Sequence, residues 1–272
     1  MTPKGKEREI EERVSPPGEV VYEAIYREGQ HELGRGNAAL ALSGLAAGLT
    51  MGFSFLSEGM LRSFLPDARW VPAVAKLGYA VGFVVVILGR QQLFTKNTLT
   101  IILPMLNRRG RDSARLRDVA RLWAIILAAN LLGAALFAAF VSLPGIFPPE
   151  ARVAFAAMGR EAIQGDFGAM LARSVLAGWL IALMIWVLPF AETARVGVIT
   201  LLAYVVGIAH LPHVVAGSVV ALYSVFAGDL GVTRYLGGFL LPALLGNAIG
   251  GVALVAVGAH AEFVEEGGAK GK

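Results

Sequence analysis

The sequence contains no cysteine and few charged residues, and both shortages narrow the classes of protein that it can encode. Without cysteine, neither a disulfide framework nor a thiolate metal site can form. Only 16% of the 272 residues are charged, against roughly 25% in a soluble domain. No phosphate-binding loop, metal-ligand cluster or nucleophile triad is recognisable, so we predict no enzyme activity, no metal and no cofactor.

The abundant residues are apolar, at 56% of the chain with a mean hydropathy of +0.64. They form runs longer than the roughly 18 residues that indicate a membrane-spanning helix, so we expect a lipid bilayer around the protein. The basic residues behind the pI of about 9.5 stand beside these runs, which favours a role in topology over nucleic-acid binding. Residues 1–35 are polar and lack the early apolar segment of a cleavable signal peptide.

The apolar runs predict an all-α integral membrane protein with six transmembrane helices. The expected spans are residues 37–57, 70–106, 119–142, 170–190, 196–226 and 236–260. They define a channel domain over residues 36–262, preceded by a segment at 1–35 with a short amphipathic helix and followed by a tail at 263–272. Residues 143–168 contain three prolines and scattered charges, which predicts an extramembrane loop.

The distribution of arginine predicts the orientation in the membrane. The loop after the second expected span is the most basic, with Arg108, Arg109, Arg111, Arg115, Arg117 and Arg121. Short loops rich in Lys and Arg stay on the cytoplasmic side. With six spans, both termini are then cytoplasmic, and we expect a multi-pass protein of the cell (inner) membrane.

The second and fifth apolar runs are too long for one unbroken span. As a single helix, residues 70–106 would extend about 55 Å, against a hydrocarbon core of about 30 Å. Polar residues interrupt this run at 90–98, and residues 210–213 interrupt the fifth, where Pro212 removes a helical hydrogen bond. Non-helical backbone at membrane depth is tolerated only inside protein or beside a wet cavity. We therefore predict that helices 2 and 5 are broken.

The two halves of the chain repeat the same order of features. The second span of each half is the broken one, and Asn130 with Gly133 in the third span match Asn247 with Gly250 in the sixth. An odd number of spans in each half gives the two copies opposite topology. Inverted repeats with paired broken helices indicate a transport site near the bilayer midplane. The two asparagines are expected to tie helices together.

Three stretches of this sequence resemble the formate/nitrite transporter family. They are residues 89–95 (Gly-Arg-Gln-Gln-Leu-Phe-Thr), 213–218 and 246–251. The resemblance covers roughly residues 20–262, and it is nearest to a branch with Arg-Gln-Gln before Leu-Phe-Thr. It implies an aquaporin-like protomer with its own pore, a homopentamer, and passage of small monovalent anions or weak acids such as formate, nitrite or acetate.

The resemblance also implies which residues line the pore. Leu93 and Thr95 match the family's loop in the second span, and His213 matches its central histidine. Tyr79 matches an aromatic constriction residue, with Phe83 one turn later. Two positions depart from the family: the partner of the aromatic constriction is Val206, and a pore-lining asparagine of the fourth span is replaced by Gly178.

Further candidates come from the polar residues around the first break. Arg90 and Lys96 are costly at mid-depth unless they meet water or a partner, so they either attract anions or bind backbone carbonyls at the break. Asn97 can hydrogen-bond a substrate or cap the second half-helix. Phe94 lies between these residues in the loop and joins the candidates for the pathway.

His213, rather than His210, is expected to be the central pore residue. His213 follows Pro212, where a second half-helix would begin, and the positive end of a helix dipole favours a neutral, proton-exchanging imidazole. His210 would end the first half-helix, where the negative end favours a charged, carbonyl-bound imidazole. We therefore predict pH-dependent transport through His213, which lends a proton to the anion.

Two other functions are compatible with this architecture. A neutral-solute channel of the aquaporin or glycerol type would have a similar fold, but its paired Asn-Pro-Ala motifs are missing. A non-transporting membrane scaffold or receptor would leave two matched polar breaks without a purpose. The anion channel remains the favoured interpretation.

Overall fold

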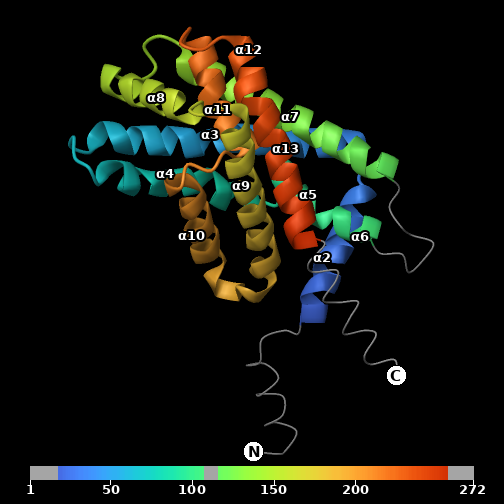
Figure 1. The fold of residues 1–272 in the computed structure, drawn as a ribbon. Helices are drawn as coiled ribbons and strands as arrows, with labels where there is room; N and C mark the ends of the chain where they lie inside the picture. The colour runs from blue at the N-terminus through green and yellow to red at the C-terminus, as the bar shows by residue number, and fades with distance from the viewer. Residues whose placement is uncertain (1–17, 107–115, 257–272) are drawn as a thin grey trace, which may run out of the picture.

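The computed structural model describes residues 18–106 and 116–256, and all regular structure in these residues is helical (Figure 1). Five helical stretches are long and apolar enough to cross a membrane. They are Asn37–Phe64 (α3), Val71–Leu88 (α4), Leu116–Ser142 (α7), Phe167–Phe190 (α9 and a short turn) and Val232–Ala253 (α12, α13 and the π-helical turns beside them). Most of the arginine-rich loop and the whole expected C-terminal tail lie outside the described residues.

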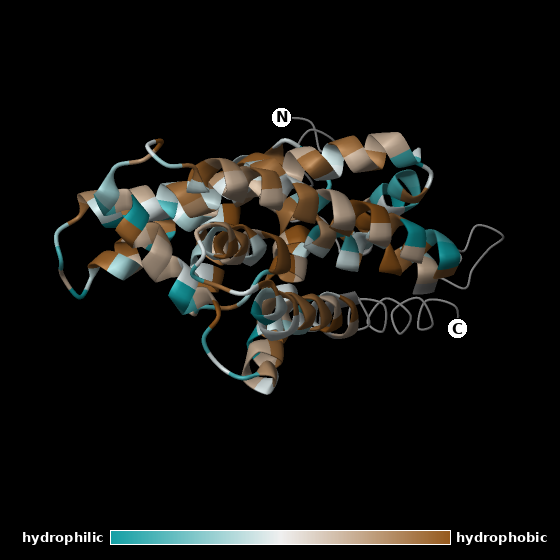
Figure 2. Cartoon of the chain, turned by 90° about the horizontal axis from the view of Figure 1, so that it is seen from above, coloured by the Kyte–Doolittle hydropathy of each residue, from teal (hydrophilic) through white to brown (hydrophobic). Residues whose placement is uncertain are grey.

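The remaining helices are shorter. They are α2 (Gly18–Leu33), α5 (Phe94–Thr100), α6 (Ile102–Leu106), α8 (Pro149–Ala162), α10 (Arg195–Ile208) and α11 (Val214–Phe226). In Figure 1, α3 and α4 lie side by side, while α9, α10 and α13 run across them. Hydrophobic residues dominate the middle of the long helices and hydrophilic ones gather near their ends and in loops (Figure 2).

The second and fifth expected spans are each interrupted by a non-helical segment of the same shape. Helix α4 ends at Leu88 and α5 begins at Phe94, while α10 ends at Ile208 and α11 begins at Val214. Arg90 and His210 occupy equivalent places, each with a left-handed φ of 50°. The residues before the second half-helices also correspond, with φ and ψ of −104° and 129° at Leu93 and −104° and 123° at His213.

Two buried asparagines hold these breaks in place. Asn130 of α7 donates to the carbonyls of Gly44 (2.7 Å) and Gln92 (2.8 Å) and accepts from the Phe94 N–H (2.9 Å). Asn247 of α13 (Leu241–Ile249) repeats the set in the other half. It donates to Ser174 (2.8 Å) and Pro212 (2.9 Å) and accepts from Val214 (2.8 Å). The expectation that both residues tie helices together is confirmed.

Glycines allow the helices that carry these asparagines to approach closely. A Cβ on Gly48 of α3 would lie 2.1 Å from the Asn130 carbonyl oxygen, and one on Gly178 of α9 would lie 2.3 Å from that of Asn247. Any larger side chain would push the helices apart. Gly178, the departure from the family's asparagine, therefore has a packing reason in this chain.

The expectation of a loop over residues 143–168 is wrong in its central part, because α8 forms there. Pro148 precedes this helix and Pro149 is its first residue, a position that suits proline because the missing N–H has no helical partner. Its apolar face buries Phe155, whose ring lies 4.8 Å from Phe55 and 5.5 Å from Tyr223, centre to centre. Proline is common both in loops and at the start of a helix, so Pro148 and Pro149 alone do not distinguish the two.

The last span also differs from its expected form. Two π-helical stretches flank α13, at Tyr235–Leu240 and Gly250–Ala256. Nothing in the apolar run of 236–260 distinguishes π-helical from α-helical hydrogen bonding, so this feature could not be predicted.

The close approach of α9 and α13 leads to a test of stability. Replacing Gly178 with Ala should lower the free energy of unfolding by roughly 1–3 kcal/mol, the usual cost of overpacking, because the new methyl group meets backbone. Gly197 of α10 is a matched control, since no atom lies within 4 Å of a Cβ there. Thermal unfolding in detergent should show a lower midpoint for Gly178→Ala alone. Equal midpoints for the two variants would contradict this packing.

Candidate permeation pathway

The two breaks meet at a hydrogen bond in the middle of the molecule. The hydroxyl of Thr95, in α5, lies 2.7 Å from Nε2 of His213, which directly precedes α11. Thr95 is 0% exposed and His213 is 1% exposed. Residues separated by 118 positions in the chain are thus brought together in a site shielded from solvent.

The bonds around His213 define which nitrogen carries the proton. Nδ1 accepts the backbone N–H of Ala216 at 3.1 Å and so caps α11. An accepting Nδ1 is unprotonated, which leaves the proton of a neutral imidazole on Nε2, and this N–H donates to the Thr95 oxygen. The hydroxyl hydrogen of Thr95 remains available, because no bond that it donates is formed among the described residues. A donor at the centre of the molecule is therefore free for a small acceptor.

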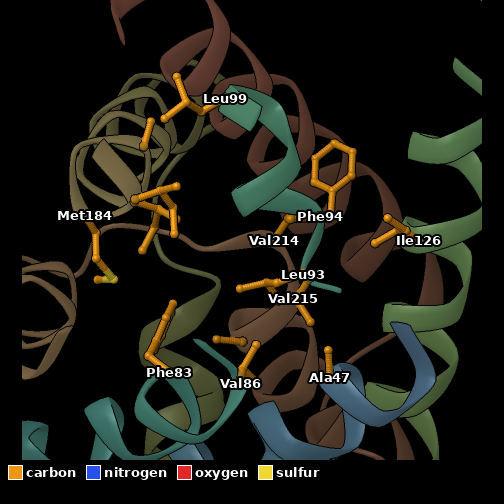
Figure 3. Packing of buried hydrophobic residues seen from close by; sticks show 14 of the residues in the cluster. Ala47, Phe83, Val86, Leu93, Phe94, Leu99, Ile126, Met184, Val214 and Val215 are labelled. Atoms are coloured by element: carbon orange, nitrogen blue, oxygen red, sulfur yellow. The ribbon is translucent and has the colours of Figure 1, made fainter. Parts of the chain in front are cut away.

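Apolar side chains surround this pair. The Phe83 ring packs edge-on against His213, with 5.0 Å between ring centres, and Tyr79 lies 5.3 Å from Phe83. Phe83, Leu93 and Val206 are fully buried. Phe83 and Leu93 belong to the same packed cluster, shown in Figure 3. Phe83, Leu93 and Val206 offer no hydrogen bond to an ion, so Tyr79 brings the one hydroxyl among these surrounding side chains.

A small cavity of about 80 Å³ opens on one side of this constriction. Tyr79, Val206 and His213 contribute to its wall, together with the charged or titratable side chains Glu58, Lys76, Glu161, Arg173 and His210. A larger cavity, of about 1050 Å³, is lined by α2, the first break and the start of α10. Its charged or titratable residues are Arg27, Glu28, His31, Glu32, Arg35, Arg90, Lys96 and Arg195.

The two cavities lie at opposite ends of α4. Lys76 and Tyr79, near its start, line the smaller cavity, whereas Ile87 and Leu88, at its end, line the larger one. Phe83 stands between them and is fully buried. Two charged cavities therefore lie on either side of an apolar segment in which His213 is a buried titratable group.

The structure separates the other predicted site residues. Arg90 is exposed in the larger cavity and His210 is exposed in the smaller one, so neither reaches the constriction. Phe94 packs on the Trp123 ring, with 5.6 Å between centres. Asn97 donates to the Gln92 side chain (2.9 Å) and the Leu93 carbonyl (3.1 Å), so it braces the break. Lys96 pairs with Glu28 of α2 at 2.7 Å.

The sequence analysis missed a buried group of charges beside the smaller cavity. Glu58 of α3 pairs with Lys76 (2.7 Å) and Arg62 (2.8 Å), and Arg62 also pairs with Glu161 of α8 (2.8 Å). Lys76 could have indicated this group, because a charge inside an apolar span is a functional candidate by default. Glu58 was overlooked because the first span was expected to end at residue 57, whereas α3 continues to Phe64.

The comparisons with known proteins agree with this arrangement. The family model described as formate/nitrite transporter matches residues 19–261. The inner membrane protein YfdC of Escherichia coli is 38% identical over 96% of this chain and 84% of its own length. The uncharacterized transporter YrhG of Bacillus subtilis is 25% identical over 88% of this chain and 90% of its own length.

Solved structures show the same fold at low sequence identity. A pentameric formate channel with formate bound has a TM-score of 0.70, covering 84% of this chain and 98% of its own. An ion channel of the same family has a TM-score of 0.77, covering 88% and 96%. Both are 18% identical to this chain. The expected aquaporin-like arrangement is confirmed by these neighbours.

Proposed function

Because this chain belongs to the formate/nitrite transporter family, we propose that it conducts small monovalent anions or their weak acids, such as formate, nitrite or acetate. Members of this family are membrane transporters and channels rather than enzymes. The observation that carries the proposal is the Thr95–His213 pair, which is buried at an apolar constriction between two charged cavities and borders the smaller one.

The constriction imposes a cost on any ion that enters it. An anion that leaves water for an apolar site loses its hydration, and it becomes neutral when a proton is within reach. The free hydroxyl hydrogen of Thr95 supplies one hydrogen bond in place of water. Because the Thr95 oxygen accepts from His213, its own O–H is polarised and donates more strongly.

His213 can also move a proton to the anion. Its Nε2 proton passes to the Thr95 oxygen as the Thr95 hydroxyl proton passes to the substrate. In the same step Nδ1 takes a proton from water of the smaller cavity, which His213 lines, and its bond to the Ala216 N–H opens, so the imidazole stays neutral. The net result is one proton transferred from water to the anion. Hydroxide remains in the cavity, and a neutral acid crosses Phe83 and Leu93.

The larger cavity favours the arrival of anions. Its wall contains Arg27, Arg35, Arg90, Lys96 and Arg195 against two glutamates. Among the described residues, Arg90 and Arg195 form no ion pair, so their charges are not neutralised by the protein. A cavity with an excess of one sign of charge raises the local concentration of the opposite ion.

Assembly and orientation follow from the same proposal. Large apolar side chains remain exposed on the isolated chain, among them Leu42, Leu132 and Leu201 at 69%, 54% and 61%. Such surfaces suit lipid or neighbouring copies of the chain. A homopentamer with a pore in each protomer would cover such surfaces, and the arginine-rich loop after the second span favours cytoplasmic termini.

Uptake into proteoliposomes tests the proposed substrate class. Formate, nitrite and acetate should enter faster than through protein-free vesicles, and faster at an acidic than at a neutral external pH, because protons are consumed as neutral acid forms. Glycerol swelling should stay at the protein-free rate. Rapid glycerol entry without anion entry would identify a neutral-solute channel, and a lack of any flux would favour the scaffold.

Native mass spectrometry tests the assembly. The protein released from detergent should appear as a pentamer of the 28.7 kDa chain. A stable monomer or tetramer would contradict this expectation.

The two histidines of the second break provide a test of the relay. Asparagine at position 213 can still cap α11 through its Oδ1, as Nδ1 of His213 does, but it is too short to replace Nε2 and cannot exchange a proton. His213→Asn should therefore slow formate uptake roughly tenfold or more, within the usual effect of general acid–base groups, and flatten its dependence on pH.

His210→Asn is the matched control, since it makes the same change at the mouth of the smaller cavity. It should retain the pH dependence of the unmodified protein. The assignment is wrong if His210→Asn abolishes that dependence while His213→Asn preserves it.

A further inference from the structure

A chain of four charged side chains, three of which line the smaller cavity, is not used by the Thr95–His213 relay. It runs from Lys76 to Glu58, from Glu58 to Arg62 and from Arg62 to Glu161, with closest distances of 2.7, 2.8 and 2.8 Å. Glu58 is 1% exposed, and the side chains of Lys76 and Arg62 are 11% and 10% exposed. Burying three of these charges is costly, whereas the Glu161 side chain is 35% exposed.

Lys76 is the member of this chain that faces the pathway. It lines the cavity, and its Nζ lies 5.8 Å from the centre of the Tyr79 ring at the constriction. Gly207 leaves room for it, because a Cβ there would lie 3.2 Å from both the Lys76 stem and the Tyr79 ring. The ammonium is therefore held where a solute leaves the cavity for the apolar constriction.

The Lys76 ammonium has donors to spare. An ammonium has three N–H groups, and Lys76 uses one on Glu58. No other acceptor among the described residues is bonded to it. In a site with so little solvent access, the remaining N–H groups are available to water or to an anion in the cavity.

The wall of the cavity carries a net positive charge that one monovalent anion can balance. Burial by itself would raise the pKa of the Glu161 carboxyl, but the hydrogen bonds and the charge of Arg62 outweigh it and lower that pKa. Glu161 is therefore ionised at neutral pH, and the four-residue chain is neutral as a whole. Arg173 adds one uncompensated positive charge to the wall.

The cavity has room for an occupant. Its volume of about 80 Å³ exceeds the roughly 10–15 Å³ that one water molecule needs. A small hydrated solute can therefore reach the Lys76 ammonium.

From these observations we propose that Lys76 is the anion-selecting residue of this pore, and that it binds a small monovalent carboxylate or oxyanion in the smaller cavity beside Tyr79. Glu58 is its counter-charge, which keeps the binding weak enough for release, since conduction requires both entry and exit. This assignment rests on the proposed function and specifies where that pore distinguishes an anion from a neutral solute.

Concentration-dependent formate uptake in proteoliposomes tests the assignment. Lys76→Gln should raise the half-saturating formate concentration roughly tenfold, a typical effect for the loss of one charge-assisted hydrogen bond, with less change in the maximal rate. Lys76→Arg should restore most of the affinity. Arg160→Gln removes the same charge from an exposed position on α8 outside the cavity, and it should leave the half-saturating concentration unchanged.

Glu58→Gln tests the assignment independently, because it should lower the half-saturating formate concentration instead of raising it. With its counter-charge removed, Lys76 should hold formate more tightly, so the half-saturating concentration and the maximal rate should both fall. An unchanged half-saturating concentration in assembled Lys76→Gln, or in Glu58→Gln if the first variant does not assemble, would overturn the assignment. An unmodified protein that carries no anion would instead refute the proposed function.

Discussion

The structure depends on one constraint: every backbone group at membrane depth needs a hydrogen-bond partner inside the protein. Two helices are interrupted in the interior, and each interruption exposes N–H and C=O groups that no helix satisfies. Asn130 and Asn247 meet this need with three bonds each, one accepted from the start of a half-helix and two donated to carbonyls. Without such ties, the breaks would be too costly to persist.

The same ties explain why a polar site can exist in an apolar constriction. Each asparagine fixes the first residue of a half-helix, so the N-termini of α5 and α11 point to the centre of the molecule. His213 precedes one of them and Thr95 lies in the first turn of the other. The helix dipoles place partial positive charge at the Thr95–His213 pair, and the bond from Ala216 fixes the His213 tautomer. The hydrogen bonds that stabilise the two breaks therefore also position Thr95 and His213.

The candidate site could be predicted where the type of a residue and its position at a helix break indicate the same role. His213 stood out from His210 because it follows a proline at the start of a half-helix, and the structure places these two histidines in the constriction and at a cavity mouth respectively. Asn97 and Arg90 had two interpretations each, because spacing in the chain does not reveal what a side chain meets. The Glu58–Arg62–Glu161 contacts could not be predicted, since they join α3 to a helix that was expected to be a loop.

The sequence alone determined that this is a multi-span helical membrane protein of inverted-repeat design, because long apolar runs and paired polar interruptions have few solutions in a bilayer. It also determined the family, through short motifs at the breaks. Only the tertiary structure decided which polar residues share a space. Thr95 and His213 come from opposite halves of the chain, and so do Lys76 and Gly207. Their contact depends on how the two repeats pack against each other, as where Gly207 of one half lies against Lys76 and Tyr79 of the other, and spacing along the chain does not reveal that packing.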